Sequence, residues 1–274
     1  MLRFYEVLQN EINKRPQEAR VGGIPSVENK IRGYLNLMFS KNGQWTKPNL
    51  EIVNNTPIWA LIFYFLRSGH AEEALDFTMR NEAMFQKMER SFSSYLKAYV
   101  TAPNNRLPQQ LHDRLHTEFN QRIKFLVASS DPFKHAVYKL IGRCDLSRRS
   151  LPEILPLAED WMWLQLVLCS EINDASQPLY EQLSLDHLQR TLLQYGPRHF
   201  NPKGTNPGPY YQFLMMVGLF ERSVHYMYQF QPMDAVHVAI TLSYYGLLRV
   251  VSTQSADNNL RETSVVCLLT LSVH

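Results

Sequence analysis

The stretch Pro57-Ile-Trp-Ala-Leu-Ile-Phe-Tyr-Phe-Leu66 decides the fold class, because it is apolar throughout and carries no charged residue. The stretch Trp161-Met-Trp-Leu-Gln-Leu-Val-Leu168 has the same character. A helix that is apolar on nearly every side must be covered on both sides, which is typical of the inner layer of a stacked helical array. We therefore predict an all-α chain built of stacked helices.

Outside these two stretches, apolar residues recur at every third or fourth position, which is the spacing of one face of a helix. One such series predicts a helix over residues 82–100, and a second predicts another helix after Pro108. The two series are Met84, Met88, Phe92, Tyr95, Leu96 and Tyr99, and Leu111, Leu115, Phe119, Ile123 and Leu126. No stretch of six or more residues alternates cleanly between apolar and polar, so we predict no β-strand.

Residues suited to begin a helix precede several of the predicted helices. Thr56-Pro57 and Asp131-Pro132 each place a capping side chain directly before a proline. The side-chain oxygen can accept a backbone N–H of the first turn, and a proline at the first helical position has no N–H to leave unpaired. Ser26 and Ser150 are weaker starts of the same kind.

Glycines separate the apolar helices. Gly69, Gly218 and Gly246 each lie between two apolar segments, where a left-handed residue can end one helix of a hairpin. The 28 residues from Gly218 to Gly246 fall within the usual ~20–45 residues of a solenoid repeat, although the sequence has no strict period. We predict irregular stacked helical hairpins, with later helices over residues 178–195, 210–217, 219–230 and 232–245.

Two segments have the composition of connections. Residues 40–55 carry Gly43, Pro48 and several asparagines, and residues 196–209 hold three glycines and four prolines. A run so rich in proline cannot hold a helix. We predict loops in both places.

The composition excludes several classes of protein. The 274 residues carry 28 basic and 25 acidic side chains, which are interspersed, so we expect no direct contact with nucleic acid. Cys144, Cys169 and Cys267 are widely spaced and indicate neither a disulfide framework nor a zinc site. The longest apolar run, residues 58–66, has nine residues, against the ~20 that a membrane-spanning helix needs. With no signal-peptide core at the N-terminus, we expect membrane association only through partners.

The segment His112-Asp-Arg-Leu-His116 is the one arrangement that suggests a metal. Two histidines four apart on a helix can reach one zinc ion, but Asp113 stands where the HExxH pattern of zinc proteases has its catalytic Glu. Both histidines also flank an apolar stripe, where polar side chains are expected. The sequence has no glycine-rich nucleotide-binding motif and no GxSxG motif. We therefore predict no catalytic, cofactor-binding or metal-binding residue.

Three stretches together are similar to the nucleoporin-interacting component family, the α-helical scaffold nucleoporins of the inner ring of the nuclear pore. They are residues 56–74 (TPIWALIFYFLRSGHAEEA), residues 131–145 (DPFKHAVYKLIGRCD) continued by 159–164 (EDWMWL), and residues 232–240 (PMDAVHVAI). Residues 25–33 (PSVENKIRG) resemble the segment that precedes them in the family. No single motif is decisive, but their order and spacing are specific, and the likeness covers roughly residues 22–250.

The resemblance implies a bent α-solenoid akin to vesicle-coat scaffolds, without catalytic activity, in the nuclear pore complex of the nuclear envelope. It implies that the chain holds other nucleoporins, namely the large ring scaffolds and a membrane-associated linker nucleoporin. Partner segments would lie as short helices in grooves between solenoid helices, and several modest contacts would add up. Such a scaffold supports nucleocytoplasmic transport of proteins and mRNA.

The sequence predicts three parts: an N-terminal helix and loop over residues 1–25, a solenoid over residues 26–252, and a linker with a truncated terminal helix over residues 253–274. Family members are longer and carry a coiled coil that holds the channel nucleoporins. Residues 1–18 are too short for a coiled coil, so we do not expect this chain to bind channel nucleoporins. The apolar residues 265–273 need a covering neighbour, and we expect an isolated preparation to aggregate.

Three other interpretations fit part of the pattern. A vesicle-coat or tethering solenoid would share the composition and the glycine hinges. A helical-repeat adaptor that binds peptides should have a regular repeat, which the sequence lacks. An enzyme built around His112 and His116 should bind zinc.

Overall fold

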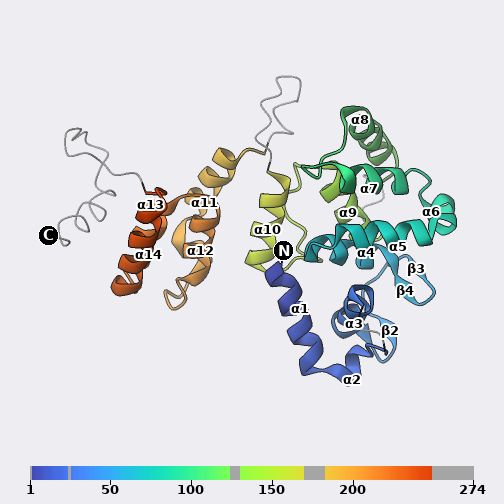
Figure 1. Ribbon diagram of the computed structural model, residues 1–274, viewed down its shortest axis with the longest axis horizontal. Helices are drawn as coiled ribbons and strands as arrows, with labels where there is room; N and C mark the ends of the chain where they lie inside the picture. The colour runs from blue at the N-terminus through green and yellow to red at the C-terminus, as the bar shows by residue number, and fades with distance from the viewer. Residues whose placement is uncertain (1, 24–25, 124–129, 170–182, 249–274) are drawn as a thin grey trace. The chain divides into compact units, whose positions relative to one another are not determined.

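The computed structural model of the chain describes residues 2–23, 26–123, 130–169 and 183–248 (Figure 1). The chain divides into two compact units, Met1–Ile154 and Leu155–His274. The part boundaries predicted after residues 25 and 252 stay predictions, and the predicted terminal part, residues 253–274, lies outside the described residues.

Unit 1 is built of helices and two short hairpins. Its elements are α1 Leu2–Lys14, α2 Pro16–Ala19, α3 Val27–Phe39, β1 Ser40–Lys41, β2 Gln44–Trp45, β3 Ile52–Val53, β4 Thr56–Pro57, α4 Ile58–Ser68, α5 Ala71–Arg80, α6 Glu82–Met88, α7 Phe92–Thr101, α8 Gln109–Glu118, the π-helix η1 Phe119–Ile123 and α9 Pro132–Gly142. The described part of unit 2 consists of α10 Ala158–Leu168, α11 Leu185–Phe200, α12 Gly208–Met216, α13 Phe220–Tyr228 and α14 Pro232–Tyr244. The predicted all-α class is confirmed.

Helix α4 lies in the middle of unit 1 (Figure 1). Every one of its residues, from Ile58 to Ser68, is buried, and the helix contacts α1, α3, α5 and α9. The ring centroid of Trp59 lies 4.8 Å from that of Phe92. The prediction that this apolar stretch is a helix covered on all sides is confirmed, because other helices surround it.

Two of the predicted helix starts are confirmed by their caps. The carboxylate of Asp131 accepts a hydrogen bond from the Phe133 N–H at 2.9 Å at the start of α9. The hydroxyl of Ser26 accepts one from the Asn29 N–H at 3.2 Å at the start of α3. Both side chains satisfy a donor of the first turn that has no partner within the helix.

Of the other two predictions, the start at Thr56-Pro57 is wrong only in its cap, because α4 does begin directly after Pro57, and the start at Ser150 is wrong. Thr56 and Pro57 pair with β3 as strand β4, and the Thr56 hydroxyl accepts a hydrogen bond from Arg32 instead of capping α4. Ser150 lies in a connection without helix, and α10 begins only at Ala158. The local pattern predicts that the Thr56 hydroxyl caps a helix, but in the structure this hydroxyl takes part in a tertiary contact with Arg32.

The single helix predicted over residues 82–100 is two helices. α6 ends at Met88 and α7 begins at Phe92, because Glu89 leaves the helical region with φ −146° and ψ 82°. At this bend the Glu89 carboxylate lies 2.6 Å from the ammonium group of Lys134. Phe85 before the break and Phe92 after it both pack on the ring of Trp59, and the predicted apolar series included Phe92 but not Phe85.

Two β-hairpins lie within or beside residues 40–55, where the sequence predicts a loop. β1 pairs with β2 and β3 pairs with β4, both antiparallel. Their turns are Asn42-Gly43 and Asn54-Asn55, with φ of 54°, 80°, 50° and 58°, which is the conformation of two-residue hairpin turns. The prediction of no strand is wrong here, because strands of two residues are too short to show an alternating pattern.

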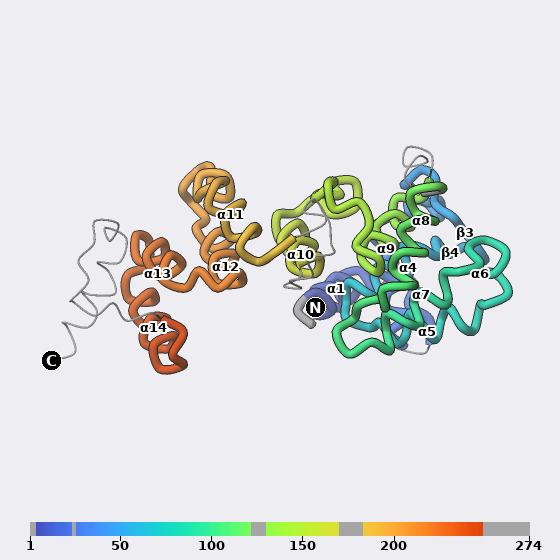
Figure 2. Tube along the Cα trace, turned by 90° about the horizontal axis from the view of Figure 1, so that it is seen from above, coloured from blue at the N-terminus to red at the C-terminus, as the bar shows by residue number. Residues whose placement is uncertain are grey.

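The helices of unit 2 follow one another as hairpins, with α12 against α13 and α13 against α14 (Figure 2). Gly218 follows α12 with φ 77°, and Gly246 follows α14 with φ 69°. The three helices predicted from residue 210 onward are confirmed, as are the left-handed glycines, including Gly69 with φ 86° after α4. The predicted start at Pro178 lies outside the described residues.

The loop predicted over residues 196–209 is wrong in its first part. Helix α11 continues to Phe200 across a kink at Gly196, whose φ is 69° and ψ 175°. Pro197 stands at the start of the second helical piece, where a proline needs no partner for a backbone N–H. The non-helical Gly196 therefore separates two helical pieces, one that ends before it and a short second one that begins at Pro197.

Helix α10 is only partly enclosed, although its sequence is apolar on nearly every side. Met162, Leu164 and Leu168 are buried, whereas Trp161 and Trp163 are half-buried. The prediction of a fully covered helix, confirmed for α4, is wrong for α10.

Candidate partner-binding surfaces

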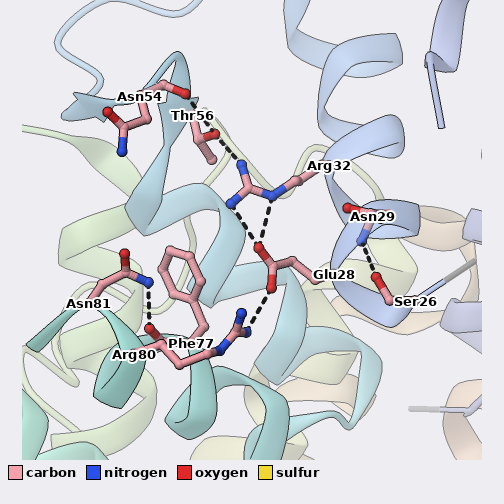
Figure 3. A network of polar contacts seen from close by, with 9 residues as sticks. All are labelled: Ser26, Glu28, Asn29, Arg32, Asn54, Thr56, Phe77, Arg80 and Asn81. Atoms are coloured by element: carbon pink, nitrogen blue, oxygen red, sulfur yellow. Dashed lines mark hydrogen bonds and ion pairs between the residues drawn. The ribbon is translucent and has the colours of Figure 1, made fainter. Parts of the chain in front are cut away.

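A polar network joins α3, α5 and β4 (Figure 3). The carboxylate of Glu28 lies 2.8 Å from the guanidinium group of Arg32 and 2.8 Å from that of Arg80. Arg32 also donates to the hydroxyl of Thr56. Burial opposes the ionisation of Glu28, but the hydrogen bonds from Arg80 and Arg32 outweigh it and hold the pKa of this carboxyl below its ordinary value. Two guanidinium groups share one carboxylate, so the network has a net charge of +1.

A hollow of about 450 Å³ borders this network, and we name it the basic hollow. α3 and the turns around it supply a lining rich in N–H groups and without an acidic side chain: Arg20, Arg32, Asn29, Asn36, Asn54 and Asn55, together with Trp45. The left-handed backbone of the Asn54-Asn55 turn places two of these amides at the tip of the β3–β4 hairpin. Such a lining offers hydrogen-bond donors to a ligand that carries acceptors.

A second hollow, of about 470 Å³, also borders the network and has the opposite charge. Its lining includes the carboxylates of Glu28, Glu73 and Asp76 and only one cationic side chain, Arg80. We name it the acidic hollow. The two hollows share Asn29 in their linings, so a positive and a negative surface lie side by side in unit 1.

A third hollow, of about 450 Å³, lies between α11, α12 and α13 of unit 2. Its floor is apolar and is formed by Leu193, Pro197, Tyr210, Leu214, Leu219 and Tyr226. The polar part of the lining comes from α13 and the residue that follows it: Glu221, Arg222, His225 and Gln229. An apolar floor with a polar edge has the chemistry of a groove for an amphipathic helix.

Helix α14 presents an apolar face to solvent. Met233, Ile240 and Tyr244 are spaced by seven and four residues, which places them on one side of the helix, and they are 70%, 57% and 85% exposed. We name these three residues the α14 stripe. The opposite side, with Ala235 and Ala239, packs in the core of unit 2. Exposed large apolar side chains on one face of a helix are typical of an interaction site, and the exposed His237 lies between Met233 and Ile240 on this face.

His112 and His116 lie together on α8, with ring centroids 4.1 Å apart. However, Nε2 of His116 is 2.7 Å from the carbonyl oxygen of Gly142, so this histidine hydrogen-bonds to the last residue of α9. In the part of the chain that the structure describes, no group of three His, Cys, Asp or Glu side chains could hold a metal ion. His116 thereby joins α8 to the end of α9.

Other titratable side chains are buried along α9. Lys139 is fully buried, donates to the carbonyl oxygens of Cys144 and Asp145, and has its pKa lowered to about 8 by burial. Burial also lowers the pKa of His135 to about 4, and its Nε2 lies 3.5 Å from a carboxylate oxygen of Asp145. None of the three hollows has these groups in its lining. Their contacts hold the connection after α9.

No sequence motif indicated any residue of these surfaces. The basic hollow takes its lining from residues 20–57, and their side chains come together only when α3 packs beside both hairpins. The one available signal was the pair of two-residue turns, Asn42-Gly43 and Asn54-Asn55, which are typical of β-hairpins.

Fold and surfaces together define a class, the α-helical scaffold module. Stacked helices carry hollows and an exposed apolar face, and the described residues contain no group of side chains arranged for metal binding. None of the helices in the described ranges has both the length and the apolar character needed to cross a bilayer.

Comparison with known proteins identifies the family. The Nup93/Nic96 family model matches residues 2–271. The chain is 50% identical over 256 residues to the meiotically up-regulated gene 87 protein of Schizosaccharomyces pombe, which covers 93% of this chain and 30% of that protein. It is 39% identical over 251 residues to nucleoporin NIC96 of Saccharomyces cerevisiae, which covers 91% of this chain and 29% of that protein. The chain belongs to the Nup93/Nic96 family.

A solved structure agrees with this assignment. The crystal structure of Chaetomium thermophilum Nic96 SOL matches with a TM-score of 0.83 and 38% sequence identity, over 94% of this chain and 37% of that one. The predicted family resemblance and the solenoid-like all-α fold are thereby confirmed. The chain spans less than a third of the length of the two relatives above.

Proposed function

We propose that this chain is a structural constituent of the nuclear pore complex, an inner-ring scaffold segment at the nuclear envelope. The observation that carries the proposal is the family match over residues 2–271, supported by 39% identity to a nucleoporin over 91% of the chain. In this role the chain holds other nucleoporins in place and so supports the transport of proteins and mRNA between nucleus and cytoplasm.

The mechanism is adhesion at several sites. Unit 1 offers two hollows of opposite charge, and unit 2 offers an apolar groove and the α14 stripe. Each is a modest contact by itself, and contacts held in one assembly reinforce one another. The proposed partners are the large ring scaffold nucleoporins and a linker nucleoporin. The proposed role is structural and not catalytic, as the family match suggests.

Crosslinking mass spectrometry of the tagged chain in isolated nuclear envelopes tests this function. Exposed lysines such as Lys41, Lys87 and Lys97 provide reactive groups on unit 1. We expect crosslinks to other inner-ring subunits above the level obtained with the tag alone. Crosslinks to vesicle-coat subunits instead would favour the alternative of a coat scaffold, and an absence of pore crosslinks above background would refute the proposal.

A further inference from the structure

We propose that the basic hollow of unit 1 binds an acidic, extended segment of a partner protein, with a carboxylate of that segment seated against Arg20. This specifies the chemistry of one partner of the scaffold proposed above. Its test uses the purified chain, so its failure and the failure of the pore assignment are distinguishable.

Arg20 provides a cation that is available to a ligand. The neighbouring Arg15 lies within 3.8 Å of the carboxylates of both Glu11 and Glu18. Arg20 is exposed at the end of α2, in a left-handed conformation with φ 51°, and no acidic side chain lines the hollow that it borders. A carboxylate from a partner would therefore meet this guanidinium group without displacing a partner from the described residues.

Further donors surround the same space. The indole N–H of Trp45 is buried and has no hydrogen-bond acceptor within the described ranges of the chain. The amide groups of Asn54 and Asn55 stand exposed at the hairpin tip. The exposed amide groups can donate to a ligand that brings carbonyl and carboxylate oxygens, and Trp45 lines the same hollow. An extended polypeptide carries such oxygens at every residue.

The hollow is also open to a main chain. Gly22 and Gly23 border it, and a Cβ atom added at either position would meet nothing within 4 Å. An extended segment can therefore enter along this edge. A side chain placed there can occupy the hollow without disturbing the fold, which provides a test.

The charges that line the two hollows direct an acidic segment to the basic hollow and away from the acidic hollow. Arg20 and Arg32 both line the basic hollow, no acidic side chain does, and the carboxylate of Glu28 that pairs with Arg32 is shared with Arg80. The adjacent acidic hollow, with the carboxylates of Glu73 and Asp76, repels the same ligand. Charge complementarity of this kind selects partners and their register.

The experiment measures the binding of a fluorescein-labelled oligoglutamate peptide to the purified full chain by fluorescence anisotropy. We expect the Arg20→Glu variant to weaken binding by about tenfold or more, because a charge-assisted hydrogen bond is replaced by repulsion. We expect Gly23→Asp, which brings an internal carboxylate to the edge of the hollow, to weaken it by roughly threefold. Lys97→Glu on α7 makes the same charge change as Arg20→Glu outside the hollow and should stay within about twofold of the wild type.

A second readout locates the ligand. In the ¹⁵N-labelled chain the indole resonance of Trp45, assigned with Trp45→Phe, should shift when the peptide is added, and an oligoglutamine peptide should neither bind nor cause the shift. Equal weakening by Arg20→Glu and Lys97→Glu would show that only the overall charge attracts the peptide and would overturn the proposal. So would a lack of binding by the wild type. Tighter binding of a phosphoserine peptide, displaced by inorganic phosphate, would overturn it in favour of a phosphate site.

Discussion

Helices α4 and α14 are both rich in apolar residues, yet their surroundings differ completely. All residues of α4 are buried, including Arg67 and Ser68, whereas Ile240 and Tyr244 of α14 are 57% and 85% exposed. The apolar character of a helix therefore shows that its faces need a partner, but it does not show that the partner lies within the same chain.

Helices α4 and α14 also differ in the charged side chains that lie on or beside them. Next to α4, the ammonium group of Lys134 lies between the carboxylates of Glu51 and Glu89, and the indole N–H of Trp59 donates to Glu51 at 2.6 Å. Helix α14 carries one acidic residue, Asp234, and no lysine or arginine. The charges of Lys134, Glu51 and Glu89 next to α4 are paired within unit 1, whereas α14 carries one exposed charge, Asp234, beside exposed apolar side chains that are suited to further contact.

Replacing Trp59 by alanine should have the largest effect on this comparison. The ring is fully buried and packs against the rings of Phe85, Phe92 and Tyr138. Its removal leaves a cavity, so we expect a loss of about 3–5 kcal/mol in the free energy of unfolding. Urea denaturation followed by circular dichroism measures this loss. The control Met233→Ala on the α14 stripe should change stability by less than about 0.5 kcal/mol, and similar losses in both variants would contradict the comparison.

Replacing Lys134 by methionine should have the second largest effect. Its Nζ lies 2.9 Å from Glu51 and 2.6 Å from Glu89, so its loss leaves two partly buried carboxylates without their common cation. We expect a loss of about 3 kcal/mol in the free energy of unfolding by the same measurement. Lys14→Met is the matched control, because Lys14 pairs with Glu11 at an exposed position and its loss should cost less than about 1 kcal/mol. If both variants lose equally little, the cluster beside α4 does not stabilise unit 1.

The third prediction concerns pH and Asp131, the cap of α9. Burial raises the pKa of Asp131 from 3.8 to about 6, although the backbone N–H groups of Glu51 and Phe133 donate to its carboxylate. The carboxyl group of Asp131 therefore binds a proton more tightly in the folded chain than in the unfolded chain. The stability that protonation contributes is present below about pH 4 and is lost as the pH rises through about 6.

Asparagine at position 131 keeps an acceptor for the cap but does not titrate. The free energy of unfolding of the wild type relative to Asp131→Asn should therefore fall by roughly 2–3 kcal/mol between pH 4 and pH 7. Urea denaturation of both proteins across this range measures the difference. A difference that stays constant with pH would show that Asp131 titrates normally.

Local signals were enough to predict part of the fold. The caps at Ser26 and Asp131, the left-handed glycines and the apolar stretch of α4 depend on residues a few positions apart, and the structure confirms them. Each of these features follows from backbone geometry that a short segment can satisfy by itself.

The features that could not be predicted depend on residues far apart in the sequence. The Thr56 hydroxyl accepts a hydrogen bond from Arg32, 24 positions away, instead of capping a helix. The Glu28 carboxylate pairs with Arg80, 52 positions away. The bend at Glu89 faces Lys134, and the basic hollow combines a helix end, α3, Trp45 of β2 and the tip of the β3–β4 hairpin. No local pattern records such contacts, because packing brings the side chains together only after the helices have formed.

Changing the α14 stripe should have the smallest effect on folding and a distinct effect on association. Ile240→Lys and Tyr244→Lys alter exposed side chains, so the free energy of unfolding should change by less than about 0.5 kcal/mol. The isolated chain should nevertheless self-associate less, because a charge at either position makes burial of the stripe costly. Light scattering at high protein concentration measures this. Thr241→Lys adds the same charge on the same helix, about 100° around its axis from Ile240, and should leave association unchanged. A wild-type chain that is already monodisperse and monomeric would refute the stripe as an association surface.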